Sequence, residues 1–272
     1  MLEGLTKYWG FYFVATPDIN GVGNCDLRDA LDAIADYSEW ESDLERLNPK
    51  ERVTQQKVNR QIASRHLRRA LAARVVVFEL FLQVAKEVDG SLQEKHKRIW
   101  LLFQISDNLV PSARNFHPFV RIMCLKCASS EALDDLLDRF GDILRDYLSN
   151  SHFIVGLDEA QWASRKYLRP FISSHNPVIF RSIIREITVV LTKLPIKLVL
   201  SGTGLSLEEV QDSIASGVSK LHNAVKVVHE LGMFDTWEKL KPFLQRYIPA
   251  SILYSDSGEH LQQRMRDYLQ GR

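Results

Sequence analysis

The sequence predicts an α/β fold in which a parallel sheet is interrupted by a large helical insertion. Short apolar runs at 11–15, 153–157 and 196–200 are typical of buried parallel strands, because apolar residues follow one another there without alternation. A similar run at 225–228 predicts a fourth strand. The stretch from about 26 to 150 has a helical pattern almost throughout, so we expect the first two strands to be separated by helices.

The helical insertion is predicted from apolar residues that recur every three or four positions. We expect helices at 29–40, 53–88 and 133–148, with a break at Asn48 and Pro49, and a helix near the start that Gly10 ends. The side chains of the longest helix that are predicted to face inward are Ile62, Leu67, Leu71, Val75, Phe78, Leu82 and Val84. Its polar face is predicted to carry Arg60, Arg65, Arg68, Arg69 and Arg74. A solvated helix face explains these arginines more simply than nucleic-acid binding does.

The composition argues against several classes of protein but does not identify the class to which this chain belongs. In 272 residues the apolar fraction is 45% and the net charge is +1, which gives no electrostatic case for nucleic acid or an anionic membrane. No apolar run approaches the roughly 20 residues that span a bilayer, and the amino terminus lacks the pattern of a signal peptide. Three cysteines do not make a disulfide framework, which fits a reducing compartment. We therefore expect a soluble, intracellular protein.

Two adjacent acids, Asp158 and Glu159, follow the apolar run at 153–157. Parallel strands deliver such residues to the edge of the sheet where ligands bind. In nucleotide hydrolases the first acid of this pattern, known as Walker B, holds Mg²⁺ through its water shell, and the second polarises the attacking water. The alternative is a strand end that carries two solvated acids.

Hydroxyl side chains follow the next predicted strand, at Ser201 and Thr203. A helix is expected between the two strands, with Asn176 as its cap, Pro177 in its first turn and an apolar stripe of Ile183, Ile187, Val190 and Leu191. A strand, a helix and a strand of this length form a crossover unit that brings the two strand ends together. Ser201 or Thr203 is therefore expected beside the acids, where a hydroxyl can contact a γ-phosphate.

Two other sequence features bear on ligands. The motif G-x-x-x-x-G-K-[ST], which cradles phosphates with backbone amides and a lysine, is absent from the sequence. Cys124 and Cys127 have the spacing of half a zinc site, with His117 nearby, but a structural zinc site needs four ligands. Small buried cysteines explain this pair more simply.

Several segments, in this order along the chain, together resemble the nucleotide-hydrolase domain of fungal Crinkler-type effector proteins, which is a P-loop NTPase. They are KYWGFYFVATPDINGVG, FIVGLDEAQ, IKLVLSGTGLS, ELGMFDTWEKLKPFLQRYIPAS and LQQRMRDYLQGR. In that family a GKT loop immediately precedes a helix like the one at Met1–Leu5, and further helices and often a nuclease-like domain follow. The resemblance therefore implies a domain truncated at both ends, which lacks the phosphate-loop strand.

The resemblance implies roles for individual residues. Asp158 falls on the family's metal-side acid and Glu159 on its catalytic acid, while Ser201 and Thr203 fall on its sensor hydroxyls. Arg272 matches the start of its sensor-two-like region, and the phosphate-loop lysine has no counterpart. Residues 1–204 are then the NTPase-like core, and 205–272 supply its last strand and a C-terminal helical lid.

The resemblance also implies ligands, partners and location. Mg²⁺ and ATP are expected for a complete domain. Neither is assigned to this fragment, which is expected to be an inactive ATPase-type enzyme unless the missing phosphate loop is restored. The partners it implies are a nucleotide and a fused nuclease-like domain or a host protein, with delivery to a host cell or nucleus.

Two alternative functions stay open at this point. Without the phosphate loop, the chain could be a catalytically inactive scaffold or protein-interaction domain. A helicase is suggested by Asp158–Gln161 followed by Ser201–Thr203, but helicases need a second core domain, and residues 205–272 are too few for one.

Overall fold

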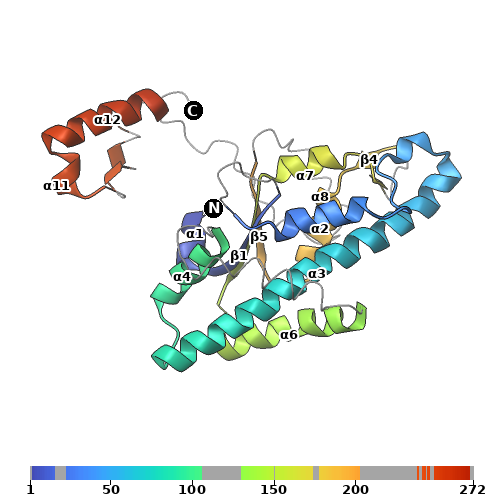
Figure 1. Ribbon diagram of the computed structural model, residues 1–272, viewed down its shortest axis with the longest axis horizontal. Coiled ribbons are helices and arrows are strands. Elements are labelled where there is room, and N and C mark those ends of the chain that lie inside the picture. Colours follow the sequence, from blue (N-terminus) through green and yellow to red (C-terminus); the bar gives the residue numbers. More distant parts are fainter. Residues whose placement is uncertain are drawn as a thin grey trace. The chain divides into compact units, whose positions relative to one another are not determined.

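The protein is described from a computed structural model, which describes residues 2–15, 23–105, 130–149, 151–173, 178–202 and 248–269, with 238, 241–242 and 244–245. The chain divides into two compact units, Met1–Asn223 and Ala224–Arg272 (Figure 1). The sequence-based boundary at 204 and 205 falls before this division. Each unit is described by itself below.

A small parallel sheet forms the centre of the first unit. Its strands lie in the order β1-β2-β5 and run Trp9–Val14 (β1), Phe153–Asp158 (β2) and Lys197–Leu200 (β5). Phe11 lies opposite Val155, and Leu157 lies opposite Leu200. The parallel pairing of three predicted strands and the helical insertion between the first two are confirmed. The strand predicted at 225–228 lies outside the described residues.

The first unit is rich in helices that cover the sheet (Figure 1). Their bounds are α1 Leu2–Lys7, α2 Asp26–Ala35, α3 Pro49–Asp89, α4 Glu94–Ile105, α6 Ser130–Leu148, α7 Ala160–Lys166 and α8 Ile184–Leu191. A 3-10 turn spans Leu44–Arg46, and a short antiparallel pair joins β3 (Phe171–Ile172) to β4 (Phe180–Arg181). The predicted helix at 133–148 is confirmed.

Alternate residues of β1 enter two separate apolar clusters, as the pleat of a strand requires. Phe11 packs edge to face against Phe78 of α3 and Phe153 of β2, in the main core that α2, α3, α6 and α8 also enter. Tyr12, on the opposite face, joins a smaller cluster with Leu101 of α4. Both faces of β1 are therefore covered, which explains its continuous apolar sequence.

Helix α3 is the longest element and begins four residues before its predicted start at Val53. Asn48 caps it by accepting hydrogen bonds from the amides of Lys50 and Glu51, and the Glu51 carboxylate accepts a hydrogen bond from the Asn48 amide. With Pro49 in the first turn, these residues form a complete capping box, so the predicted break is the start of the helix.

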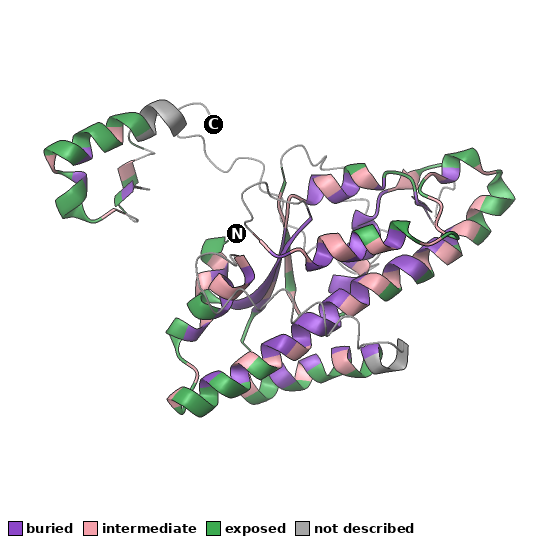
Figure 2. Cartoon of the chain, in the orientation of Figure 1, coloured by how far each residue is buried: buried purple, intermediate pink, exposed green. Residues whose placement is uncertain are grey.

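Burial along α3 follows the predicted stripe except at three positions (Figure 2). Val84 is 57% exposed, so its predicted inward position is wrong. Arg68 and Arg74 are buried, although the polar face was predicted to carry them. Arg74 is 0% exposed and forms a paired ion contact with Asp26 of α2, with Nε–Oδ2 2.5 Å and Nη2–Oδ1 2.9 Å. A carboxylate that meets the guanidinium fork allows this arginine to be buried.

Trp9 and Gly10 belong to β1 and not to a first helix, which corrects the prediction that Gly10 ends a helix. A β-carbon at Gly10 would lie 2.2 Å from the Ile154 carbonyl oxygen and 2.3 Å from Cδ2 of Leu5. The glycine therefore permits the close approach of α1 and β2 to β1, and it does not serve as a helix terminator.

Two other helix predictions have wrong boundaries. The helix predicted at 29–40 is α2, which begins at Asp26 and ends at Ala35, because Trp40 leaves the helix to pack against Tyr167 and Phe171. The helix predicted between the second and third strands is α8, which begins only at Ile184, because 180–181 pair as strand β4. Its predicted cap, Asn176 with Pro177, lies outside the described residues. Its predicted apolar stripe, Ile183, Ile187, Val190 and Leu191, is buried and confirmed.

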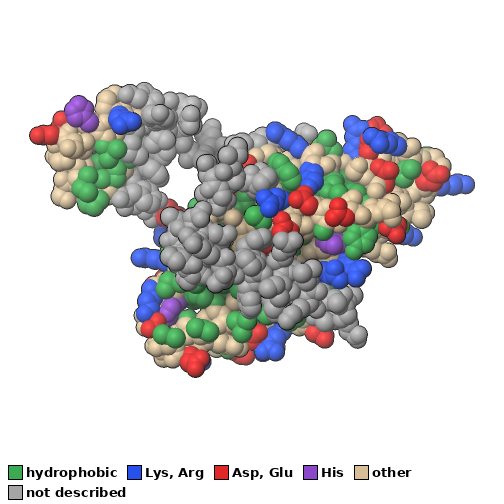
Figure 3. Space-filling model, viewed as in Figure 1, with side chains coloured by type: hydrophobic (Ala, Val, Ile, Leu, Met, Phe, Trp, Pro, Cys, Tyr) green, Lys and Arg blue, Asp and Glu red, His purple; other side chains and the backbone are tan. Residues whose placement is uncertain are grey.

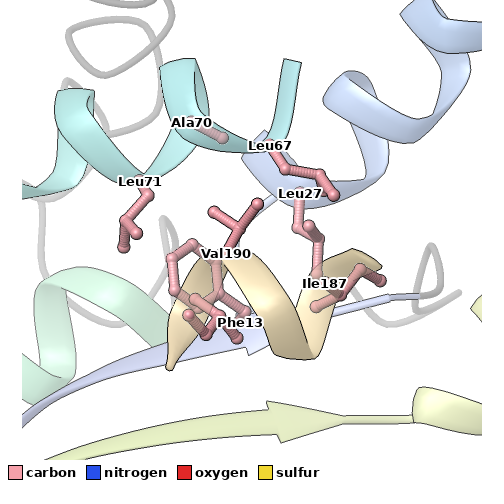
Figure 4. A pocket seen from close by; sticks show the side chains of 8 residues that line it. Phe13, Leu27, Leu67, Ala70, Leu71, Ile187 and Val190 are labelled. Atoms are coloured by element: carbon pink, nitrogen blue, oxygen red, sulfur yellow. The ribbon is translucent and has the colours of Figure 1, made fainter. Parts of the chain in front are cut away.

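The core between α2, α3, α8 and β1 contains a small apolar void (Figure 4). Its volume is about 10 Å³. The residues that line it are Phe13, Leu27, Leu67, Ala70, Leu71, Ile187, Val190 and Leu191. A void of this size with no polar lining offers nothing to hold a ligand.

The second unit contains α11 (Ala250–Leu253) and α12 (Asp256–Leu269). Pro249 precedes α11, and Gly258 lies where a β-carbon would meet the Ile252 carbonyl oxygen at 1.9 Å. Gln262 donates a hydrogen bond to the carbonyl oxygen of Leu253, which ties the two helices together. Among the described residues, none of the helices has the length and apolar character needed to cross a membrane.

Candidate functional site

The acids and one of the predicted hydroxyl residues meet at the carboxyl end of the sheet. Asp158 is the last residue of β2, and Glu159 follows it. Ser201 comes directly after β5, and its amide donates a 2.9 Å hydrogen bond to the carbonyl of Leu157. The carbonyl of Ser201 in turn accepts a 3.0 Å bond from the amide of Ala160. The two strand ends are therefore fixed to each other by backbone bonds on both sides of the acids.

The carboxylate of Asp158 accepts three hydrogen bonds. Oδ1 receives the hydroxyl of Ser201 at 2.5 Å and the amide of Glu159 at 3.0 Å. Oδ2 receives the phenol of Tyr12 at 2.7 Å. Because Tyr12 comes from β1 and Ser201 follows β5, the carboxylate is held from both neighbouring strands. Asp158 is half-buried, so it remains accessible to a ligand.

Glu159 has a left-handed backbone conformation, with φ 53° and ψ 35°. This conformation costs free energy for a residue that has a β-carbon, and residues strained in this way are concentrated at functional sites. Glu159 is also the cap residue of α7, and its side chain accepts a hydrogen bond from Nε2 of Gln161. The turn from β2 into α7 therefore directs two consecutive carboxylates differently: Asp158 is bonded across the strands, and Glu159 is bonded to α7.

Sequence reasoning missed Tyr12 and Gln161 as parts of this site. Tyr12 is 3% exposed and lies in a run that reads as plain apolar strand. Its residue type could have indicated a polar contact, because a buried tyrosine hydroxyl needs a hydrogen-bond partner. Gln161 is the last residue of the segment FIVGLDEAQ, but its contact with Glu159 depends on the left-handed turn, which no sequence pattern predicts.

The remaining predicted ligand residues lie outside the described part of the chain. These are Thr203, Arg272, and the zinc candidates His117, Cys124 and Cys127. In the part that the structure describes, no group of three or more His, Cys, Asp or Glu side chains is arranged to hold a metal ion.

The donor set at the site nevertheless fits Mg²⁺. This ion is commonly held by one or two carboxylates, with water and phosphate oxygens completing its shell. Asp158 supplies one such carboxylate at the carboxyl end of the sheet, where it is half-buried. A carboxylate offers about four lone-pair positions, so the three hydrogen bonds to Asp158 leave room for a single ligand or bound water.

Two other polar regions lie away from these acids. A depression of about 460 Å³ lies at the amino ends of β2 and β5, the end of the sheet opposite the acids. It is lined in part by Arg145, His152 and Lys197. At the start of α8, Glu186 contacts Arg185 and lies 3.4 Å from Nε of Arg60. Burial raises the pKa of Glu186, against the opposing effect of the two arginines.

Positively and negatively charged side chains do not form separate patches on the face that Figure 3 shows. Lys and Arg are intermixed with Asp and Glu over the described part of the first unit. Comparison with known proteins gives no further guide, because no family model, curated protein or solved structure matches this chain.

Proposed function

We propose that the carboxyl end of the sheet is a divalent-cation site for nucleotide phosphates, in an ATPase-type module with a P-loop NTPase-like core. The observation that carries this proposal is the bond between Asp158 and Ser201 across two neighbouring parallel strands, with Glu159 next in the chain. Parallel sheets bind ligands at this end. Acids and hydroxyls on adjacent strand ends are the groups that a cation and a phosphate require.

Each residue has a distinct role in this proposal. Asp158 holds Mg²⁺, and the ion, when bound, neutralises charge on phosphate oxygens. Glu159 is the base that orients and polarises the attacking water, because its carboxylate is not engaged by the strand ends. Ser201 fixes the orientation of Asp158. Thr203, as the second hydroxyl of the pattern, is proposed to contact the phosphate.

The residues of this site support phosphate binding less well than cation binding. The sequence contains no G-x-x-x-x-G-K-[ST] loop, which supplies most contacts to a triphosphate through amides and one lysine. We therefore expect residues 1–272 to bind Mg-ATP weakly or not at all, with a Kd above the micromolar range. Titration calorimetry measures this affinity, and a micromolar value would reveal a phosphate cradle of another kind.

The resemblance to Crinkler-type effectors supports a role as a switch within a longer protein. In that role hydrolysis changes how the helical lid and neighbouring domains are arranged. The proposed partners are a nuclease-like domain in the same chain or a host protein, and the proposed place of action is a host cell or its nucleus.

A second candidate, an inactive scaffold, is favoured by a specific observation. The protein's own groups already donate three hydrogen bonds to Asp158, so the carboxylate is satisfied without a metal. In a scaffold these bonds would serve only to join the three strands at their carboxyl ends.

Equilibrium binding of ATP with and without Mg²⁺ separates the two candidates. In a protein supplied with a G-x-x-x-x-G-K-[ST] loop ahead of residue 1, the nucleotide-site proposal predicts binding that requires Mg²⁺ and is lost in Asp158→Asn but kept in Glu159→Gln. Any hydrolysis should be slower in Glu159→Gln by roughly 10²–10⁴-fold, the usual contribution of a positioned base. Binding that ignores both Mg²⁺ and Asp158→Asn supports the scaffold.

A further inference from the structure

The depression at the amino ends of β2 and β5 lies away from the proposed cation site. Its volume of about 460 Å³ falls in the range of small-molecule sites, roughly 300–1,000 Å³. Phe153, which lines it, and Asp158 are the two ends of β2, about 17 Å apart in an extended strand of this length. A small molecule held in the depression therefore does not contact Asp158.

One wall of the depression is apolar and firmly packed. Leu144 of α6 and Phe153 of β2 line it, and they are only 5% and 1% exposed because both belong to the main core. Pro195 and Ile196, which precede β5, add further apolar surface. This wall is positioned by a helix and two strands, so it offers a preformed surface to an apolar group.

The charged side chains that line the depression are all of one kind. Arg145 of α6, His152 before β2 and Lys197 of β5 are exposed, and none of the described residues that line the depression is acidic. Arg145 pairs with Asp142 at 2.5 Å, whereas no acid in the described part of the chain pairs with Lys197. The depression therefore favours an anion.

Gly141 lies inside α6, where a glycine weakens a helix relative to alanine. Its backbone does not need a glycine, because its φ is not positive and a β-carbon would meet no heavy atom within 4 Å. Gly141, Leu144 and Arg145 are spaced to lie on one face of α6, and all three line the depression. A larger residue at 141 would therefore take up space in the depression, which the glycine keeps open.

We propose that this depression binds a small organic anion. The apolar ring or chain of the ligand lies against Leu144 and Phe153, and its charged head meets Arg145 and Lys197. A guanidinium pairs with carboxylate and phosphate alike, so the ligand class is an anionic head on an apolar body. The inference goes beyond the proposed function and does not depend on it, because the two sites share no residue.

The test uses anilinonaphthalene sulfonate, an aromatic sulfonate whose fluorescence rises on binding, with the full chain of residues 1–272. We expect the wild-type protein to bind one molecule. The affinity should fall as NaCl is raised from about 0.05 M to about 0.5 M, because salt screens the attraction between exposed charges. Thermal melting shows whether each variant is folded.

Gly141→Leu should weaken binding of the probe by roughly tenfold or more, because the new side chain obstructs the depression. Gly141→Ala is its matched variant, since it adds one methyl group and should keep most of the binding. It should also raise the melting temperature by about 2–4 °C, because alanine favours the helix.

Lys197→Met and Arg145→Met should each weaken binding by about two- to fivefold, the range for an exposed pair of charges. They also test the inference if Gly141→Leu does not fold. Lys57→Met is the control, because Lys57 is an exposed residue of α3 that does not line the depression. Its affinity for the probe should equal that of the wild-type protein.

Competition with naphthyl phosphate and with naphthoate, which share a ring system and differ in the head group, identifies the preferred anion. Displacement of the probe by either one supports the inference. Equal displacement by inorganic phosphate would overturn it, because the apolar wall would then take no part. Absence of probe binding by the wild-type protein, or unchanged binding in folded Gly141→Leu, overturns it as well. None of these results bears on the proposed cation site, which Mn²⁺ binding tests separately.

Discussion

The hydroxyl of Ser201 lies 2.5 Å from Oδ1 of Asp158, although 43 residues separate them in the chain. The contact joins the residue after β5 to the last residue of β2, at the end of the sheet where parallel strands bind ligands. It makes Ser201 a positioning group for the carboxylate on which the proposed function depends.

Ser201→Ala should lower the free energy of unfolding by about 1–3 kcal/mol, because a hydrogen bond to a half-buried carboxylate is lost. Ser201→Thr retains the hydroxyl and should lower it by less. Urea denaturation of both variants measures the difference. Equal losses in the two variants would mean that the hydroxyl contributes nothing at this position.

Glu159→Gly should be more stable than Glu159→Ala by about 1 kcal/mol, because only glycine adopts the left-handed conformation without cost. Both changes remove the carboxylate, so their difference isolates the backbone strain. Ser149, with φ 50°, gives a matched control: its Gly and Ala variants should differ similarly without affecting cation binding. If Glu159→Ala is as stable as Glu159→Gly in urea, no strain is stored at the acid.

Arg74→Met should lower the free energy of unfolding by about 3–5 kcal/mol, because it leaves Asp26 charged, buried and without its partner. The double variant Arg74→Met with Asp26→Leu should recover much of this loss, since apolar pairs replace buried ion pairs well. Denaturant unfolding of the single and double variants gives the coupling. Arg145→Met, which breaks an exposed pair with Asp142, is the control and should change little.

Stability should fall as the pH is lowered below 6.5, in part because of His66. Burial lowers the pKa of His66, and Arg69 and Arg65 lower it further, against the opposing effect of Asp36. The unfolded chain then binds a proton at a higher pH than the folded chain does, so acid favours unfolding between the two pKa values.

His66→Phe tests this pH dependence, because it keeps an aromatic ring beside Tyr37, which lies 5.2 Å from the imidazole. The variant should show a shallower loss of melting temperature from about pH 6.5 downward. The same slope in both proteins would show that His66 takes no part.

The parts of the fold that sequence predicts are those encoded by local pattern. The run at 153–157 and the stripe at 133–148 define a strand and a helix without reference to the rest of the chain, and both are confirmed. The failures depend on distant partners. Gly10 was predicted to end a helix, because the sequence does not show that Ile154 and Leu5 pack against it. Arg74 was predicted to face solvent, because its partner Asp26 lies 48 residues away in the chain.

The candidate site was predictable to a similar extent. Adjacent acids after a strand and a hydroxyl after the next strand predict that Asp158 and Ser201 meet, and they do. Tyr12 could not be placed, because a shift of one residue in β1 would turn it to the other face of the sheet. The left-handed turn at Glu159 is likewise set by how β2 passes into α7 and by no residue pattern.

The most direct test of the account is the binding of Mn²⁺ to the wild-type protein, to Asp158→Asn and to Glu159→Gln, measured by electron paramagnetic resonance. We expect the wild-type protein to bind one Mn²⁺ that Mg²⁺ displaces. Asp158→Asn should weaken this binding by roughly tenfold or more, as the loss of a charged ligand requires, while Glu159→Gln should leave it nearly unchanged. Thermal melting of each variant confirms that it is folded. Equal binding by the wild-type protein and a folded Asp158→Asn variant would contradict a cation site at the carboxyl end of this sheet.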